Sequence, residues 1–275
     1  MADAQLIDNL SLYELTLPGA HNAGCDWQAT YALIPGKNWL ACQDVSFYSQ
    51  LNRGARALDV RLEFIAEAQG LAQFRFQHNG HRSSRTLEDL IRDIKGFYER
   101  SPDEFIILDF HELKNGTKAF DHSLFKALML EHLGERMIPA KNLHLTLGQL
   151  KAISPLQRIM VAASMTWETD DHRFQRKIDH QWINQKIVST SDLRGFIADV
   201  LGKPISRLHP WSLSATSYTL GGPQRVLGAL DDWFDPDKSD WAKKCHIINF
   251  DFIKDSNLVH FCLTANLQKA REKFA

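Results

Sequence analysis

Segments that read as β-strands and segments that read as α-helices alternate along this chain, and this alternation constrains the fold most. Apolar runs of strand length lie at 55–64, 73–78, 104–113, 158–164, 212–220 and 246–253. Runs with helical periodicity lie at 86–102, 121–134, 223–235 and 259–274. Strands that alternate with helices form a parallel sheet with the helices outside. With 275 residues, the chain is predicted to be α/β, an irregular (β/α)8-type, TIM-like barrel forming a single domain over 1–275.

One long segment and the overall composition narrow the fold and the partners further. The segment 165–210 is polar and follows neither period, so we assign no element there. The net charge is -1, which gives no basic field for nucleic acid. No apolar run is long enough to cross a membrane, and the N-terminus lacks the pattern of a signal peptide. We therefore expect a cytoplasmic protein, or a secreted one if this chain is a processed form.

The four cysteines do not form a metal-binding or redox motif. None stands in a C-x-x-C pair, so zinc ligation and thioredoxin chemistry are not indicated. We expect the thiols to be mostly reduced. They are Cys25, Cys42, Cys245 and Cys262.

Polar side chains stand where the predicted strands end. In a parallel barrel the carboxyl ends of the strands gather at one face, where active sites form. Asp59 and Arg61 are two apart on one strand and so share a face. In "LPGAHNAG" (17–24), small residues flank His21 and leave room for another group to approach. The other strand-end residues are His78, Asp109, His111, Glu112 and Asp251.

Each of these residues also has a structural interpretation. A histidine at a strand end is commonly a hydrogen-bonded structural residue, Asp59 with Arg61 can be an ion pair, and Asp251 can cap a loop. The joint pattern of spacing and order favours a site more than any single residue does. The remaining histidines are interpreted as structural: His81, His111, His122, His132, His144, His172, His180, His209, His246 and His260, with His111 the least secure of these.

Several stretches, in order, resemble one known family. Together they are similar to the catalytic X-domain of phosphatidylinositol-specific phospholipases C, especially the bacterial type. The resemblance covers roughly the first 110 residues and the end of the chain. The stretches are "LPGAHNAG" (17–24), "NRGARALDVRLEF" (52–64), "FRFQHNGH" (74–81), "LEDLIRDIKGFYERSPDEFIILDF" (87–110) and "IINFDFI" (247–253).

The resemblance implies a phosphorus–oxygen lyase that acts on a phosphoinositide-type phospholipid. A headgroup hydroxyl would attack phosphorus, giving a cyclic phosphate and diacylglycerol. By resemblance, His21 is the general base and His78 protonates the departing diacylglycerol oxygen. Asp251 would hold the His21 ring, and Asp59 would act near His78. Arg61 would stabilise the charge at phosphorus.

The resemblance also bears on metal dependence. Calcium-dependent relatives carry carboxylates where the metal-free bacterial enzymes carry an arginine, so Arg61 implies catalysis with no metal and no cofactor. Asn22 favours the opposite, because metal-free members usually have aspartate after the first histidine and calcium-dependent ones have asparagine. Calcium held by Asn22 and Asp59 is therefore the alternative.

Headgroup contacts are assigned by the same resemblance. Asn22, His111 and Ser164 would face the headgroup, and Tyr218 would stack against an inositol ring. Ser164 stands where the bacterial pattern has an arginine, so a different headgroup remains an alternative.

The expected partners are a phospholipid and, transiently, the membrane interface, with no obligate protein partner evident. Several tryptophans lie in or near segments that read as loops. There they either insert among lipid headgroups or cover the ends of the barrel. They are Trp27, Trp39, Trp167, Trp182 and Trp211.

Two other function classes compete with a lipase. A non-catalytic barrel that binds phosphoinositides or a protein is disfavoured by the presence of both His21 and His78. A metal-dependent glycerophosphodiesterase-like hydrolase would need a Glu-x-Asp metal strand, and Ala57-Leu58-Asp59 stands at that place instead.

Two geometric predictions follow from the barrel. His21 and Asp251 should lie within hydrogen-bond distance, because a barrel closes its last strand against its first. In the run 73–78, Phe74, Phe76 and His78 should face the barrel mouth. His81, which follows the turn pair Asn79-Gly80, should lie in a flexible loop.

Overall fold

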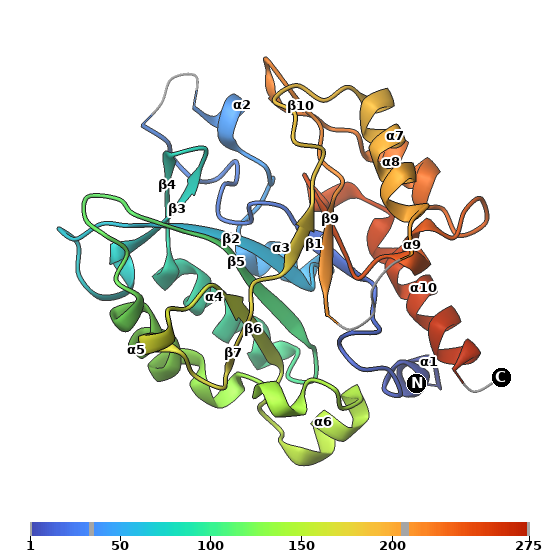
Figure 1. Cartoon of the computed structure of the whole chain (residues 1–275), viewed down its shortest axis with the longest axis horizontal. Helices are drawn as coiled ribbons and strands as arrows, with labels where there is room; N and C mark the ends of the chain where they lie inside the picture. Colours follow the sequence, from blue (N-terminus) through green and yellow to red (C-terminus); the bar gives the residue numbers. More distant parts are fainter. Residues whose placement is uncertain (1, 33–35, 205–208, 274–275) are drawn as a thin grey trace.

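A curled sheet of parallel strands forms the centre of the molecule (Figure 1). The computed structural model describes residues 2–32, 36–204 and 209–273. In spatial order, the parallel strands of this part are β7 (Phe174–Gln175), β6 (Ile159–Ala163), β5 (Ile106–Lys114), β2 (Ala57–Phe64), β1 (Leu17–Ala20), β12 (Ile247–Phe250), β9 (Trp211–Ser214) and β8 (Asp179–Gln181).

The order of the strands confirms an irregular TIM-like barrel. The last strand, β12, pairs in parallel with the first, β1, and aligns Ala20 with Phe250. The ends of the order, β7 and β8, are joined by residues 176–178, and no pairing links them in the described part of the chain. The barrel is therefore incompletely closed on that side.

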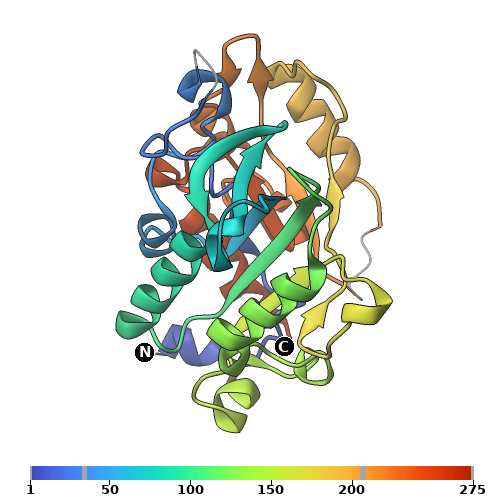
Figure 2. The same cartoon turned by 90° about the vertical axis from the view of Figure 1, so that its left-hand side faces the viewer.

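Helices cover the outside of the sheet (Figure 2). In α4 the buried residues recur with helical spacing, and the Asp89 carboxylate accepts a hydrogen bond from the backbone N–H of Thr86, which caps the start. The α-helices are α1 (Ala2–Ile7), α2 (Lys37–Leu40), α3 (Phe47–Asn52), α4 (Leu87–Arg100), α5 (His122–Leu133), α6 (Leu147–Ile153), α7 (Thr190–Leu201), α8 (Leu227–Phe234), α9 (Trp241–Lys244) and α10 (Leu258–Glu272). The 3₁₀ turns are Gly70–Gln73, Gly134–Arg136, Ala140–Asn142, Trp167–Thr169 and Ile253–Asp255.

The run 73–78 is not a barrel strand, contrary to our prediction. It forms β3 (Phe74–His78), which pairs antiparallel with the outer part of β2 and with β4 (His81–Thr86). Asn79 and Gly80 both have positive φ, 52° and 82°, as a two-residue hairpin turn requires. His81 therefore begins a strand and does not lie in a loop. The resulting hairpin projects above the parallel strands, on the side of α2 (Figures 1 and 2).

The segment 165–210, to which we assigned no element, supplies the two strands on either side of the unpaired gap in the barrel wall. These strands, β7 and β8, have two and three residues, which is too short for a periodic pattern to show. Helix α7 also lies in this segment. Of the run 212–220, β9 covers the first part. The rest leads into the small hairpin of β10 (Tyr218–Thr219) and β11 (Gly222–Pro223).

Side chains that face the inside of the barrel change character along each strand. Near the amino ends they are apolar and join one buried cluster, which includes Leu17, Ala57, Ile107 and Ile247. Near the carboxyl ends the positions on the same faces are polar: His21, Asp59, Asp109, His111, Asn249 and Asp251. Because the register aligns Asp59 with Asp109 and Gly19 with Asn249, these residues form a polar layer above an apolar floor.

Three smaller observations complete the fold. None of the helices in the described residues combines the length and apolar content needed to cross a bilayer. All four thiols are free and buried, and burial raises the pKa of each. Trp211 is the first residue of β9, directly after residues 209–210, which have no regular structure, and it is buried.

Candidate active site

His21 and Asp251 lie side by side because the strands that carry them pair. Each follows the last residue of its strand, and those last residues are aligned. The His21 Nδ1 lies 2.7 Å from the Asp251 Oδ1, as predicted. This contact leaves the His21 Nε2 directed toward Asp59, whose Oδ2 is 3.9 Å away. The imidazole is thus held by one carboxylate and presents its other nitrogen to the barrel mouth.

Gln43, which the sequence analysis did not single out, ties the two strand ends together. Its side-chain amide donates hydrogen bonds to the backbone carbonyls of His21 and Phe250, both at 3.0 Å. Its Oε1 accepts one from the backbone N–H of Ile253 at 3.1 Å. A fully buried glutamine with these partners fixes the backbone on both sides of the His21–Asp251 contact.

Asp59 is the centre of a buried charge network. Arg61 donates to it through two nitrogens, from Nη2 to Oδ2 at 2.7 Å and from Nε to both oxygens, at 3.1 Å to Oδ1 and 3.3 Å to Oδ2. The backbone N–H of Asn22 and the side-chain amide of Asn249 also donate to its Oδ2, each at 3.2 Å. Burial raises the pKa of Asp59, but the charge and hydrogen bonds of Arg61 more than offset this and hold the pKa well below its usual range. Asp59 is therefore ionised at neutral pH.

His78 faces His21 across the mouth. The two rings are 6.1 Å apart and nearly perpendicular. The His78 Nδ1 is 3.0 Å from the Leu40 carbonyl oxygen, which can only accept, so Nδ1 carries the hydrogen and Nε2 is left for other chemistry. Burial and the neighbouring charges of His21 and Arg61 lower the pKa of His78 to about 3. His78 is thus a neutral imidazole in the free protein at neutral pH.

Beside the mouth lies a cluster of three side chains, Asp109, His111 and His180. The sequence analysis listed the first two among the strand-end residues, but not His180. His111 is the extra residue of a bulge, because Val60 pairs with Phe110 while Arg61 pairs with Glu112. A bulge re-aims a side chain, and here the His111 ring stacks on His180 with centroids 3.8 Å apart. We interpreted His180 as structural. It lies beside His111, and its Nε2 is 2.5 Å from an Asp109 oxygen. No signal in the sequence located it, because β8 is so short.

The other predicted headgroup residues lie around the same mouth. The Tyr218 ring is 6.0 Å from that of His78, and its hydroxyl donates to the Trp39 carbonyl at 2.8 Å. Ser164 is exposed and lines an open cavity of ≈ 400 Å³ together with His111. The side chain of Asn22 is buried, and neither its Oδ1 nor its Nδ2 has a hydrogen-bond partner within the described residues.

The room around His21 is filled by the protein itself, which corrects one expectation. A Cβ atom added at Gly24 would lie 1.9 Å from the Phe76 ring, and one at Gly19 would lie 2.7 Å from Ile247. The small residues therefore let the hairpin and β12 pack against the His21 segment. These positions therefore offer no space for a ligand beside His21.

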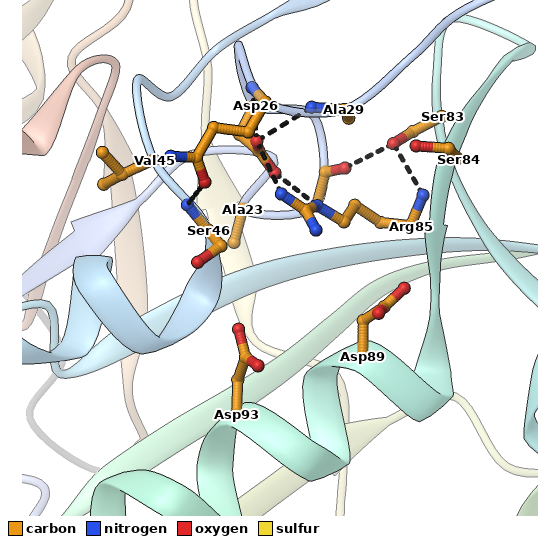
Figure 3. Close-up of polar contacts among 12 residues, drawn as sticks. Ala23, Asp26, Ala29, Val45, Ser46, Ser83, Ser84, Arg85, Asp89 and Asp93 are labelled. Carbon is orange, nitrogen blue, oxygen red and sulfur yellow. Dashed lines mark hydrogen bonds and ion pairs between the residues drawn. The ribbon is translucent and has the colours of Figure 1, made fainter.

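A buried ion pair fastens the loop after His21 to the hairpin (Figure 3). Arg85 of β4 donates to both carboxylate oxygens of Asp26, at 2.8 and 3.0 Å. The fully buried Asp26 also accepts from the backbone N–H groups of Gln28 and Ala29. Since the hairpin carries His78 and the loop follows His21, this clamp fixes the two histidines relative to each other.

Comparison with known proteins agrees with this architecture. No protein-family model matches the chain. A stretch of 109 residues is 34% identical to a variant-surface-glycoprotein phospholipase C of Trypanosoma cruzi. The match spans 37% of this chain and 26% of that protein, so the chain corresponds to about a quarter of the relative's length.

Solved structures match over nearly the whole chain. A phosphatidylinositol-specific phospholipase C of Staphylococcus aureus superposes with a TM-score of 0.70 at 13% identity, covering 95% of this chain and 96% of that one. The phosphatidylinositol-specific phospholipase C of Listeria monocytogenes gives a TM-score of 0.67 at 17% identity, covering 94% and 95%. The chain therefore has the fold that the sequence resemblance implied.

Proposed function

We propose that this protein is a phospholipase C that cleaves a phosphoinositide-type phospholipid to diacylglycerol and a cyclic phosphate. The observation that carries the proposal is the placement of His21, held by Asp251, opposite His78, with Arg61 paired to the neighbouring Asp59. An acid, a base and a cation are what cleavage of a phosphodiester beside a hydroxyl requires. The fold and the phospholipase C relative support the same activity.

Each group has a defined task in the proposed reaction. The His21 Nε2 removes the proton from a headgroup hydroxyl, and that oxygen attacks phosphorus. The bond from phosphorus to the diacylglycerol oxygen breaks, and the His78 Nε2 gives that oxygen a proton. Asp251 stabilises the imidazolium that forms on His21. Arg61 stabilises the negative charge that accumulates on the phosphoryl oxygens.

The lowered pKa of His78 fits an acid that is charged only when substrate is present. In the free protein, burial and the neighbouring side chains of His21 and Arg61 keep it neutral. A bound phosphodiester brings a negative charge beside the ring and favours the protonated form. Binding of the correct group therefore prepares the acid.

Catalysis without metal is part of the proposal. Calcium bound through Asn22 and Asp59 would need free oxygen atoms, but Asp59 already accepts from Arg61, from a backbone N–H and from Asn249. The guanidinium of Arg61 would also repel the ion. Asn22 retains an unpaired buried oxygen, but one amide oxygen is a poor calcium site.

Exposed apolar side chains around the mouth support transient contact with a membrane. Trp39, Trp167, Trp182 and Leu220 all follow the carboxyl ends of strands, and between 43% and 86% of each is exposed. In Figure 1, α2 and the β10 hairpin lie at the same end of the molecule, far from both chain ends. We call these four residues the apolar rim. Aromatic and aliphatic side chains so placed enter lipid headgroups and bring the mouth to the substrate.

The test is hydrolysis of a panel of phospholipid vesicles, each with and without a chelator, with products identified by ³¹P NMR. Phosphatidylinositol should yield a cyclic phosphate at the same rate in both arms. His21→Ala should abolish the product, and His260→Gln, which changes an exposed histidine on α10, should not. Cleavage that requires added calcium would overturn the metal-free mechanism. A folded protein that cleaves no lipid in the panel would overturn the proposed activity.

A further inference from the structure

Three side chains that can ligate a metal meet beside the proposed acid–base pair. They are Asp109, His111 and His180, and one donor atom from each lies within 4.8 Å of the others. They come from two strands, β5 and β8, that are distant in the sequence but face the same mouth. The proposed reaction assigns no acid, base or phosphate contact to Asp109 or His180.

Two atoms of this cluster are buried without a partner. Asp109 is only 3% exposed, and its Oδ1 has no hydrogen-bond partner within the described residues. The Nδ1 atom of His111 is also buried and has no hydrogen-bond partner within the described residues. Leaving a buried polar atom unsatisfied is costly, and more so for a carboxylate oxygen. An unpaired carboxylate oxygen and an unpaired imidazole nitrogen at one place are therefore an observation that calls for a ligand.

The donor set identifies the class of ligand. Two imidazole nitrogens and one carboxylate oxygen suit Zn²⁺ and similar divalent transition metals, whereas Ca²⁺ and Mg²⁺ prefer oxygen alone. At bond lengths of about 2.0–2.1 Å, tetrahedral ligands lie roughly 3.3 Å apart. Binding therefore requires side-chain rotation that brings the donor atoms, now up to 4.8 Å apart, to this spacing and tilts the His111 and His180 rings out of their stack. The cavity that His111 lines leaves a side from which a fourth ligand could approach.

The surrounding charges permit a cation. The positive charge of Arg61 is felt at His111, but Arg61 forms an ion pair with Asp59, which neutralises it. The positive charge of Lys177 is felt at Asp109, but Lys177 is exposed and can turn toward water. Glu112, the residue after His111, is paired with Lys114 at 2.7 Å. The charge of Asp109 is thus the one available to balance a bound ion.

We propose that Asp109, His111 and His180 bind one divalent transition-metal ion, of which Zn²⁺ is the representative. The ion takes the place of the hydrogen between the His180 Nε2 and Asp109. The neutral His180 ring then carries its one proton on Nδ1 and ligates through Nε2, so no proton is lost from the ring. The site lies on the side of the mouth assigned to the headgroup. It is separate from the proposed acid–base pair, so its existence does not depend on the proposed function.

A binding measurement tests the site without reference to activity. Zn²⁺ is titrated into the whole protein by calorimetry, and Co²⁺ is followed by its visible absorption, whose intensity and position report nitrogen ligation in low coordination. The expected result is one ion per chain. His111→Gln and His180→Gln should each weaken binding by about 10–100-fold or more, and His260→Gln should leave it unchanged.

A further variant distinguishes this site from the other group of metal-capable side chains in the described residues. That group contains His21, Cys42 and Asp251. Loss of binding in Cys42→Ala, with His180→Gln binding as the wild type does, would overturn the proposal. The absence of stoichiometric binding in the folded wild-type protein would overturn it as well. Because His111 and His180 are only partly buried, their variants are expected to fold, and circular dichroism verifies this before each titration.

Discussion

Arg61 has two roles that one substitution can separate. In the proposed reaction it stabilises the charge on the phosphoryl oxygens, and in the structure it neutralises the buried Asp59. Arg61→Ala should lower kcat by about 100-fold or more, because a transition-state charge partner is lost. It should also lower the free energy of unfolding by about 3 kcal/mol, since an unpaired buried carboxylate remains. Denaturant unfolding and vesicle hydrolysis measure the two effects.

Arg61→Lys is the matched control for this substitution. It keeps the charge but loses the two-pronged hydrogen bond to Asp59. We expect most of the stability to return and only part of the rate. If Arg61→Ala hydrolyses lipid within threefold of the wild type, Arg61 does not act on the phosphate.

His78, and not His81, is expected to be the acid. His78→Ala should cripple cleavage of a substrate with an alkoxide leaving group and should affect a phenolate leaving group much less, because phenolate needs little protonation. His81→Ala, on the exposed strand beside it, is the control and should behave as the wild type does. The reverse pattern would assign the acid to His81. The two variants are each assayed with a pair of substrates that differ only in the leaving group.

The burial of His78 also makes stability depend on pH. Its pKa is about 3 in the folded protein, below the ordinary value of about 6.5. Between these values the unfolded chain holds a proton that the folded chain does not, so lowering the pH favours unfolding. The free energy of unfolding should fall by up to about 1.4 kcal/mol per pH unit below about pH 6 from this group alone. Urea titrations at several pH values should show a shallower slope for His78→Asn, and equal slopes would contradict this account.

At the scale of residues, the sequence identified the paired groups whose spacing is regular. Asp59 and Arg61 share a strand face, and the strand ends that carry His21 and Asp251 were visible as apolar runs. Gln43 and His180 could not be found in this way. Gln43 lies in a loop, and His180 lies on a strand of three residues, so no periodic pattern marks either one. Their positions depend on tertiary packing alone.

The hairpin of β3 and β4 is the element that places His78. Gly80 has φ 82° at its turn, a conformation that costs an L-residue about 1–2 kcal/mol. Gly80→Ala should lower the free energy of unfolding by about 1 kcal/mol and should reduce the rate of hydrolysis, because His78 ends the strand before the turn. Thermal unfolding and vesicle hydrolysis provide the readouts.

Gly195→Ala is the control, because it should change the free energy of unfolding in the opposite direction. Gly195 lies inside α7, and a Cβ atom there would meet nothing within 4 Å. Alanine at this position should raise stability by about 0.5–1 kcal/mol and leave hydrolysis unchanged. If Gly80→Ala is as stable and as active as Gly195→Ala, the turn does not control the position of His78.

The same hairpin shows where element prediction reached its limit. The turn signal Asn79-Gly80 was recognised, but the strand after it, "HRSSRT", has no alternation of apolar and polar residues. Its pairing with β3 and the burial of Ser83 and Thr86 stabilise it instead. Helices α4, α5, α8 and α10 and the buried strands β2, β5, β6 and β12 were predicted to within about four residues at each end, because their patterns are repeated over several turns or pairs. Helix α7, of 12 residues, was missed.

For the molecule as a whole, the apolar rim should govern association with lipid. Trp182→Ala and Leu220→Ser should each reduce partition onto phosphatidylinositol vesicles, since each buried apolar side chain contributes about 1.5–3 kcal/mol. Leu156→Ser is the control, because Leu156 is also exposed but precedes the amino end of β6, on the opposite face. Sedimentation with vesicles measures the partition. Equal loss in all three variants would exclude a role specific to the rim.

The pairing of β1 with β12 has a consequence for the life of the protein in the cell. A ribosome makes His21 early and Asp251 more than two hundred residues later, yet the two share one hydrogen bond. Every partial chain that ends before β12 lacks the partner of its proposed base, and contacts so distant in sequence form slowly. Nascent and truncated chains should therefore be harmless to the membranes around them. Under the proposed function, the ability to cleave lipid should be acquired in a single late step, when β12 pairs with β1.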